Sequence, residues 1–549
     1  MLRQGETYDE VQQRFQWDIP EFYNIGVDVC DKHAQTRPDD LALIYHTGDG
    51  APQRYSFGHL RALSNQLANV FIAKGLNRGD RVGILLPQAP ETAIVHIAAY
   101  KAGLVAVPLF TLFGQDALAY RLSSSGARLL ITGRDSLEKL SDIRSALPDL
   151  ATILSIEGSE DRTAEGVEDF HDALAAASDA FTPVVTRADD PAILVFTSGT
   201  TGPPKGALHA HRTLLGHLPG VEFPHDFFPQ PDDLFWTPAD WAWVGGLLDV
   251  LLPALHHGVP VLAYRARKFD PEEAFQLIAD YKVRNAFIPP TALKLMRQVS
   301  NPRERWDYAM RTIGSGGETL GAELLDWGRA TFDLTIHEFY GQTECNLVVG
   351  NCASVMEIRP GSMGRAIPGH TVAIIDENGV PLPDGEVGAV AIKTPDPVAF
   401  LGYWNNEKAT QEKFVGDWLV TGDLARRDED GYFWYVSRDD DIITSAGYRI
   451  GPGEIEDCLS KHPAIAMAAV IGIPDALRTE AIKAYIVLAE GASPDDDAAS
   501  RALIADIQNF VRTRLAAHEY PRHVEFMDEL PMTTTGKVMR RTLRSLNAE

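Results

Sequence analysis

The chain has 549 residues, of which 45% are hydrophobic and 23% charged, so it is long enough for two to four domains with sizeable cores. Its 50 Lys and Arg residues against 76 Asp and Glu residues give a formal net charge of −26. This charge argues against non-specific binding to nucleic acids or anionic membranes, which depends on clustered positive charge.

Four cysteines without metal-site spacing predict neither a disulfide framework nor a structural metal. The polar N-terminus does not resemble a secretory signal, and no apolar run is long enough to predict a transmembrane helix. These features favour a cytoplasmic protein.

The first third of the chain alternates helical and strand patterns. Ser56 is placed to cap a helix whose apolar face is formed by Leu60, Leu63, Leu67 and Phe71. Shorter units follow, with strands expected at 82–86, 105–108 and 128–132 and helices at 92–101 and 116–125. Strands separated by helices predict an α/β fold with parallel sheets covered by helices.

Residues 190–196 end in the apolar run ILVF, which predicts a buried strand leading directly into TSGTTGPPKG (residues 197–206). The glycines allow close backbone approach, the hydroxyls can donate to phosphate oxygens, and Lys205 adds positive charge. A strand, a Gly-rich loop and then a helix-like sequence is the layout of a phosphate site. This is not a Walker A loop, because Lys205 is followed by Gly206 rather than by Ser or Thr. An ordinary flexible loop is the disfavoured alternative.

Further along the chain the pattern changes twice. Residues 234–341 form a second α/β stretch, and beyond 361 the sequence becomes β-rich, with Asn378-Gly379 as a hairpin turn. A small α+β module then follows, with a strand pair at 442–450, a helix at 452–462, strands at 468–473 and 481–488, and a helix at 500–516. We therefore expect an N-terminal domain over 1–438 and a C-terminal domain over 439–549.

The segment TSGTTGPPKG resembles the phosphate-binding signature of the adenylate-forming, or AMP-binding, superfamily of acyl-CoA synthetases, adenylation domains and luciferases. Four more segments match its motifs in order: YGQTE at 340–344, TGD at 421–423, Arg438 and Asp440 with GYRIGP at 447–452, and PMTTTGK at 531–537. The phrases DEDGYFWYVSRDDDIITSAGYRIGPGEIE and EYPRHVEFMDELPMTTTGK are most similar to medium-chain acyl-CoA synthetases, followed by acetyl-CoA synthetases and aryl-CoA ligases. The resemblance implies a large N-terminal domain of stacked α/β sheets with a β-rich subdomain, and a small mobile C-terminal α+β domain.

The resemblance also implies an ATP-dependent acyl-CoA ligase. Such an enzyme converts a carboxylic acid and ATP into acyl-AMP and pyrophosphate, and then converts acyl-AMP and coenzyme A into acyl-CoA and AMP. ATP, Mg²⁺ and coenzyme A are the implied cofactors and substrates, without nucleic-acid or membrane partners, and a homodimer is left open. Asp440 matches the hinge about which the small domain rotates between the two reactions.

The same resemblance assigns site residues. Lys537, Thr343 and Glu344 would be catalytic, and Glu344 would also hold Mg²⁺. ATP would contact Thr197, Ser198, Gly199, Thr200, Thr201, Gly202, Lys205, Gly316, Gly317, Glu318, Glu338, Phe339, Tyr340, Gly341, Gln342, Thr343, Asp423, Arg438, Arg449 and Lys537. Coenzyme A would contact Ala446, Gly447, Tyr448, Arg478, Arg512, Tyr520 and Arg522. The acyl pocket would comprise Trp241, Trp243, Gly245, Gly317 and Asn346.

The acid itself is the least determined feature. Trp243 matches the family's usual tryptophan, whereas Trp241 is a departure, and together they predict a restricted apolar pocket for a short- to medium-chain, branched or compact acid. Placement of both rings in the core is the alternative. Cys345 and Asn346 also depart from the usual small residues, and Asn346 could read a polar group on the acid.

Two other functions are compatible with the motifs. One is an acyl-AMP ligase that loads a separate carrier protein, and release of a CoA thioester would decide between it and a CoA ligase. The other is a non-catalytic nucleotide-binding protein, against which intact Lys537, Glu344 and Asp423 argue.

Overall fold

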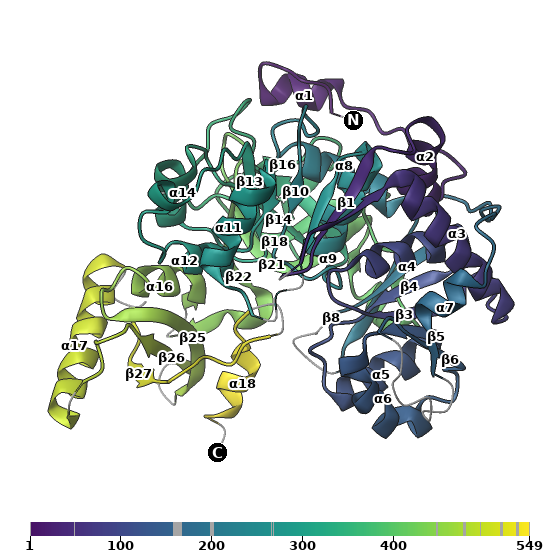
Figure 1. The fold of residues 1–549 in the computed structure, drawn as a ribbon. Helices are drawn as coiled ribbons and strands as arrows, with labels where there is room; N and C mark the ends of the chain where they lie inside the picture. The colour runs from purple at the N-terminus through teal and green to yellow at the C-terminus, as the bar shows by residue number, and fades with distance from the viewer. Residues whose placement is uncertain are drawn as a thin grey trace. The chain divides into compact units, whose positions relative to one another are not determined.

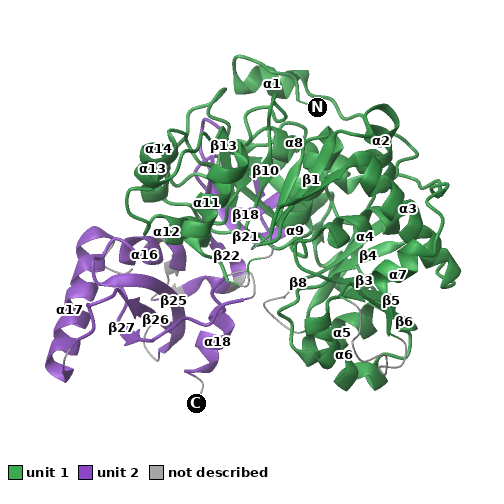
Figure 2. Ribbon diagram, in the orientation of Figure 1, with its two compact units in different colours: residues 1–372, 392–419 green, residues 373–391, 420–549 purple. Residues whose placement is uncertain are grey.

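The computed structural model describes the chain except for residues 1, 49, 158–166, 198–202, 265, 267, 446–447, 476–478, 495, 516–519, 534–536 and 548–549, and except for the side chains at 440, 444, 448, 449 and 454. Its residues fall into two compact units (Figure 2). The first comprises 1–372 and 392–419, and the second comprises 373–391 and 420–549. The expected domain boundary at 438/439 stays a prediction.

The first unit contains an eight-stranded sheet (Figure 1). Its strands are, in sheet order, β19 (Gly402–Tyr403), β9 (Lys205–Ala210), β8 (Pro191–Thr197), β4 (Val105–Pro108), β3 (Arg81–Leu85), β5 (Ala127–Thr132), β6 (Thr152–Ser155) and β7 (Val167–Asp169). Strand β3 pairs in parallel with β4 and β5, which confirms the parallel sheet expected from the helix–strand alternation.

The prediction that a helix directly follows the phosphate loop is wrong. Residues 205–210 instead form β9, which pairs antiparallel with β8, and the next helix, α8 (Thr213–Glu222), begins only after this strand. The apolar β9 residues Ala207 and Ala210 are buried, and β9 also pairs with β19 on its other side. The phosphate loop therefore connects two strands of one hairpin.

A nine-stranded sheet makes up much of the rest of the first unit. Its strands are, in sheet order, β16 (Arg365–Ala366), β15 (Cys345–Gly350), β14 (His337–Gln342), β13 (Thr312–Gly316), β12 (Asn285–Phe287), β10 (Phe235–Trp236), β11 (Val261–Tyr264), β1 (Leu41–His46) and β2 (Gln53–Ser56). Strands β12, β13 and β14 run in parallel, whereas β14 and β15 form an antiparallel hairpin.

The first unit also contains the following helices. They are α1 (Tyr8–Arg14), α2 (Lys32–Thr36), α3 (Phe57–Ala73), α4 (Pro90–Lys101), α5 (Gln115–Ser125), α6 (Leu137–Ile143), α7 (Phe170–Ala175), α8, α9 (Val244–Gly246), α10 (Leu252–His257), α11 (Pro271–Tyr281), α12 (Pro290–Met296), α13 (Pro302–Arg305), α14 (Ala322–Phe332) and α15 (Glu407–Gln411), with π-helical turns η1 (Val27–Asp31) and η4 (Leu247–Leu251) and short 3₁₀ turns η2 (Arg134–Ser136) and η3 (Arg144–Ala146). The predicted cap of α3 is confirmed, because the Ser56 hydroxyl accepts a hydrogen bond from the His59 amide at 3.2 Å. No helix in the part of the chain that the structure describes combines the length and apolar character needed to cross a bilayer.

The second unit contains the rest of the β-rich region and the small α+β module. Strands β17 (Val372–Ile375), β18 (Val387–Lys393), β21 (Trp418–Arg427) and β22 (Phe433–Arg438) lie mainly in it, while β20 (Phe414–Val415) pairs with the first residues of β21 in the first unit. The α+β module contains η5 (Asp439–Asp441), β23 (Ile443–Ser445), β24 (Tyr448–Ile450), α16 (Pro452–Leu459), β25 (Ile465–Asp475), β26 (Thr479–Leu488), α17 (Asp497–Arg514), β27 (His523–Phe526) and α18 (Arg540–Ser545). The strand pair expected at 442–450 is confirmed as β23 and β24.

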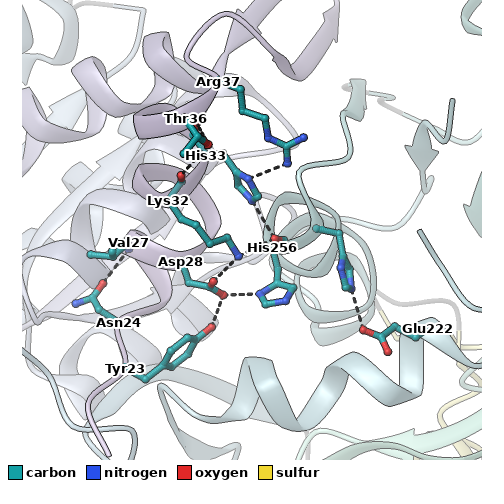
Figure 3. Close-up of polar contacts among 11 residues, drawn as sticks. Tyr23, Asn24, Val27, Asp28, Lys32, His33, Thr36, Arg37, Glu222 and His256 are labelled. Atoms are coloured by element: carbon teal, nitrogen blue, oxygen red, sulfur yellow. Dashed lines mark hydrogen bonds and ion pairs between the residues drawn. The ribbon is translucent and has the colours of Figure 1, made fainter. Parts of the chain in front are cut away.

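A polar cluster joins the N-terminal segment of the first unit to α10 (Figure 3). The Asp28 carboxylate accepts hydrogen bonds from the Tyr23 hydroxyl and Lys32 Nζ, both at 2.6 Å, and lies 2.5 Å from His256 Nδ1. Burial raises the pKa of Asp28, but the bonds from His256 and Lys32 outweigh it and hold the pKa far below its usual range. The cluster therefore links the N-terminal segment to α10, which is distant from it in sequence, through a charged carboxylate.

A buried lysine lies beneath the same segment. Lys101, at the end of α4, is completely buried, and its Nζ lies 2.5 Å from the Asp31 carboxylate and 2.9 Å from both Ser64 Oγ and Asn65 Oδ1. Each hydrogen of the ammonium group therefore has a partner. Removal of the lysine would leave the Asp31 charge buried without a counter-ion.

We expect Lys101→Met to lower the free energy of unfolding by about 3–5 kcal/mol, the usual cost of breaking a buried ion pair from one side. Urea unfolding followed by circular dichroism measures this loss. The control is Lys74→Met, because Lys74 pairs with Glu168 at the surface and such pairs contribute at most about 1 kcal/mol. Equal losses in the two variants would contradict a special role for the buried pair.

Candidate active site

The phosphate loop lies between the end of β8 and the start of β9. Thr197 is the last residue of β8, and it pairs across the hairpin with Lys205, the first residue of β9. Predicted ligands Ser198–Gly202 lie outside the described residues. The Lys205 Nζ lies 5.2 Å from the centroid of the Tyr403 ring, which places its charge over an aromatic face.

Glu344 lies in the turn between β14 and β15, together with Thr343. Its side chain is buried, and its carboxylate accepts a hydrogen bond from the Tyr403 hydroxyl. Its backbone oxygen accepts a bond from the Phe400 amide at 3.0 Å. Tyr403 therefore lies between Glu344 and Lys205, and the structure brings these two predicted residues together.

The Glu344 carboxylate also fits a magnesium ion. A hard cation prefers carboxylate and phosphate oxygens and retains water ligands. Among the described residues, no three His, Cys, Asp or Glu side chains gather as a metal centre. A magnesium ion at Glu344 would therefore need further oxygen ligands from a bound triphosphate and water.

Three residues near this turn were not predicted from the sequence. Tyr403 follows Gly402 in a two-residue edge strand beside β9, and no local pattern marks it. Lys413 Nζ donates to the side chain of Gln342 at 3.1 Å. His209, on β9, is completely buried, and burial lowers its pKa to about 3, so it is neutral at physiological pH.

The residues predicted to hold adenine meet at the ends of β13 and β14. Gly316 pairs in register with Phe339, and a Cβ at Gly316 would lie only 2.6 Å from that ring. Gly317 has a φ of +92°, which favours glycine. Glu318 accepts bonds from Thr291 Oγ1 at 3.0 and 3.1 Å. Glu338 is buried within β14, while Tyr340 and Gly341, which follow in the same strand, are half-buried.

The two tryptophans of the predicted acyl pocket have different surroundings. Trp241 is completely buried in the hydrophobic core, whereas Trp243 is half-buried and its ring lies 5.5 Å from that of Phe287. A Cβ on Gly245 would lie 2.7 Å from Phe287 and 3.0 Å from Trp243. Phe287 also contacts Phe339, at 5.3 Å between centroids. The rings of Trp243 and Phe287 thus form an aromatic wall next to Phe339 of β14, and Gly245 packs against both rings.

Asn346 does not have a free side chain. Its Nδ2 donates to the Asp249 carboxylate, which comes from the π-helical turn η4, and both side chains are buried. Its Oδ1 faces Gly341, because a Cβ there would lie 2.8 Å from that oxygen. Burial raises the pKa of Asp249 well above its usual range, although the bond from Asn346 lowers it.

In the second unit, Asp423 and Arg438 face each other across β21 and β22. The Arg438 Nε lies 3.4 Å from the largely buried Asp423 carboxylate. The Thr421 hydroxyl accepts a bond from the Asp423 amide at 3.1 Å and donates to the Val390 carbonyl at 2.9 Å, which fixes the TGD turn. The side chain of Arg449 is not described.

Lys537 has an exposed side chain in the same unit. Its amide donates to Thr533 Oγ1 at 3.0 Å, and its carbonyl accepts from the Thr533 amide at 2.7 Å. Predicted hinge residue Asp440 lies in η5, but its side chain is not described.

The residues assigned to coenzyme A are only partly described. Arg512 is exposed on α17, and Arg522 NH1 donates to the Tyr520 hydroxyl at 2.9 Å. The remaining members lie outside the described residues or lack a described side chain: Ala446, Gly447, Tyr448 and Arg478. Their role stays a prediction.

Comparison with known proteins gives consistent matches. The family model of AMP-binding enzymes matches residues 30–404, and the model of the AMP-binding enzyme C-terminal domain matches residues 454–537. The chain is 35% identical to the mitochondrial acyl-coenzyme A synthetase ACSM3 of Mus musculus (98% of this chain, 93% of the relative) and 34% identical to the acetyl-coenzyme A synthetase of Bacillus subtilis strain 168 (98% and 95%). It is also similar to the solved structure of the anthranilate CoA ligase AuaEII in complex with anthranoyl-AMP, with a TM-score of 0.87 and 29% identity over 97% of this chain and 98% of that one.

We expect the stability of the protein to depend on the ionisation of Asp249. A carboxyl whose pKa is raised on folding holds its proton more tightly in the folded state, so the free energy of unfolding falls as the pH rises from about 4 toward the folded-state pKa. In Asp249→Asn this loss disappears, so the variant gains stability relative to the wild type between pH 5 and pH 8. Urea unfolding at both pH values measures the gain.

The matched control is Asp39→Asn, since Asp39 is exposed in the same unit. Its stability relative to the wild type should not change over this range. An Asp249→Asn variant with the pH dependence of the wild type would contradict the buried, raised-pKa carboxyl.

Proposed function

The chain belongs to the family of AMP-binding enzymes and is an AMP-forming acyl-CoA ligase, and on this premise we propose how its residues divide the two half-reactions. The family, fold class and enzyme class expected from the motifs are confirmed. The roles of individual residues are our proposal.

The observation that carries the proposal is the group formed by Lys205, Tyr403 and Glu344. A cation at the start of β9 and a buried carboxylate in the β14–β15 turn contact the same phenol, next to a phosphate loop. A triphosphate needs positive charge along its oxygens and a metal-binding carboxylate nearby. The group provides both from segments far apart in the sequence.

In the first half-reaction, an oxygen of the acid's carboxylate attacks the α-phosphorus of ATP. A new P–O bond forms, the bond to the β-phosphate oxygen breaks, and pyrophosphate leaves with the bonding electrons. Lys205 and the phosphate loop bind the β- and γ-phosphates, Thr343 contacts the α-phosphate, and Lys537 stabilises the negative charge that builds up there. Magnesium bound at Glu344 would neutralise charge on the leaving pyrophosphate.

The nucleoside is bound by other residues. The Gly316–Glu318 turn and the strand end at Phe339 lie against adenine, and Asp423 accepts both ribose hydroxyls, with Arg438 and Arg449 assisting. The register of Gly316 with Phe339 and of Asp423 with Arg438 supports these pairings.

In the second half-reaction, the sulfur of coenzyme A attacks the carbonyl carbon of the acyl-adenylate. A C–S bond forms, the C–O bond to AMP breaks, AMP leaves, and the thiol proton passes to solvent. Residues 446–448 would line the pantetheine channel, and Arg478, Arg512, Tyr520 and Arg522 would contact the rest of coenzyme A.

The acid is best described as compact. The aromatic wall of Trp243 and Phe287, with Gly245 packed against both rings, supports a restricted apolar pocket. The bond to Asp249 holds the Asn346 side chain, and we propose that its Oδ1 accepts a hydrogen bond from a polar substituent on the acid. The bound anthranoyl-AMP named for the similar structure is also compact and aromatic. We therefore place aryl, branched and short- to medium-chain acids in the expected substrate class.

We also propose that the protein is cytoplasmic and that it can form a homodimer. A ligase that loads a carrier protein, the alternative left open by the motifs, would share the first half-reaction and differ only in its acceptor. A non-catalytic nucleotide-binding protein is disfavoured, because the described Lys537, Glu344 and Asp423 retain catalytic and nucleotide-binding chemistry.

The function is tested by incubating the protein with ATP, Mg²⁺ and one acid at a time, with and without coenzyme A, and measuring the release of AMP and pyrophosphate. The panel contains straight-chain, branched, aryl and sulfur-containing acids. We expect CoA-dependent AMP formation with compact acids and a thioester product. Pyrophosphate and bound acyl-AMP without thioester would point to a carrier protein. Absence of AMP and pyrophosphate with every acid, from protein that binds ATP, would contradict the proposal.

We expect Asp440→Pro to separate the two half-reactions. A proline restricts φ at the hinge, so acid activation should continue while thioester formation falls by about 100-fold or more. Pyrophosphate exchange measures the first reaction, and thioester release from synthetic acyl-AMP measures the second. Lys537→Ala is the reciprocal control, because it should lose activation and keep thioester formation. Equal loss of both reactions in a folded Asp440→Pro variant would count against the hinge.

A further inference from the structure

The loop that carries Lys537 is short and closed at its base. Met532 and Val538 form an isolated antiparallel bridge, and the Met539 amide donates to the Pro531 carbonyl at 2.8 Å. Helix α18 begins immediately afterwards, at Arg540. Interactions that hold the first residues of α18 in place therefore also hold the base of the lysine loop.

Two arginines of α18 bind two carboxylates elsewhere in the same unit. The Arg540 Nη2 donates to the two oxygens of Glu456, at 2.8 and 2.7 Å, and its Nη1 lies 3.4 Å from Asp441. Arg544 donates to the other oxygen of Asp441 at 2.8 Å. Glu456 comes from α16, and Asp441 is the last residue of η5, directly after the predicted hinge Asp440.

This four-residue ion network is largely sheltered from water. The side chains of Asp441, Glu456 and Arg540 are 11%, 20% and 23% exposed, respectively. Glu456 also accepts a bond from the Val470 amide at 2.7 Å, which ties it to β25. An arginine that bonds two carboxylates from different elements in such a place holds those elements in a fixed relation to one another.

The network adjoins the lysine loop, because Arg540 directly follows Met539, whose amide closes the base of that loop. Strand β23 is held by backbone pairing with β24 and by the pair Ser445–Thr479 with β26, without Arg540. Loss of Arg540 would therefore loosen the base of the lysine loop and leave this hairpin in place.

We propose that Arg540 is a positioning residue for the first half-reaction: its bonds to Glu456 and Asp441 join the Lys537 loop to the hinge segment, so that the lysine moves with the hinge as one body. This inference rests on the proposed roles of Lys537 and Asp440. Arg540 itself touches neither ATP nor the acid in this scheme. Its effect passes through the geometry of Lys537.

The test compares Arg540→Ala, Arg540→Lys and the neighbouring Arg541→Ala in the full-length enzyme. Arg541 is exposed on the same helix and serves as the matched control. Each variant is assayed for acid-dependent pyrophosphate exchange and for thioester formation from synthetic acyl-AMP and coenzyme A, and its thermal unfolding is recorded.

We expect Arg540→Ala to slow acid activation by about 100-fold, the usual cost of a catalytic group displaced by an ångström, while thioester formation changes by less than about twofold. Arg540→Lys should fall in between, because a single ammonium group cannot span Glu456 and Asp441 as the two guanidinium nitrogens do. Arg541→Ala should match the wild type in both reactions. If Arg540→Ala fails to fold, Arg540→Lys and Glu456→Gln carry the same comparison.

Unchanged acid activation, or equal loss of both reactions in a folded variant, would overturn the inference. Lys537→Ala, assayed in parallel, separates this failure from that of the proposed function. If Lys537→Ala loses activation and Arg540→Ala does not, only the positioning role is wrong. If Lys537→Ala retains activation, the proposed role of Lys537 is wrong and the inference falls with it.

Discussion

Bringing a carboxylate against a triphosphate is electrostatically unfavourable, and under the proposed function the charges of Lys205 and Glu344 meet this constraint. Lys205 supplies a cation at the hairpin, and Glu344 supplies a buried carboxylate suited to a divalent cation. Tyr403 contacts both and keeps them at a fixed spacing. An aromatic ring is well suited to this task, since its face attracts a cation while its hydroxyl donates to an anion.

Under the proposed function, the second unit meets a different requirement, because it must position Lys537 accurately. An exposed lysine side chain has many rotamers. The loop base is closed by a strand bridge, and the helix after it is held by two arginines. Accuracy therefore comes from charged pairs beside the loop, while the lysine side chain itself stays accessible.

The sequence predicted features that local patterns determine. Ser56 as a helix cap and the parallel pairing of β3, β4 and β5 follow from periodicity and capping preferences, and the ordered motifs identified the family. The helix expected after the phosphate loop was wrong, because a short apolar strand such as β9 is hard to distinguish from a short helix by its pattern alone. Tyr403, Asp249 and the Arg540–Glu456 pair were missed, since each acts through a partner 59 to 97 residues away that no local pattern specifies.

The chain crosses between its two units three times, after residues 372, 391 and 419, and this order has a consequence for synthesis on the ribosome. Domains that are contiguous can fold as they emerge. Here the edge strand β19, with Tyr403, completes the eight-stranded sheet only after a segment of the second unit has already been made. The nascent first unit must therefore hold an unfinished sheet edge until residue 403 leaves the exit tunnel, and an exposed edge of this kind is a natural substrate for a chaperone.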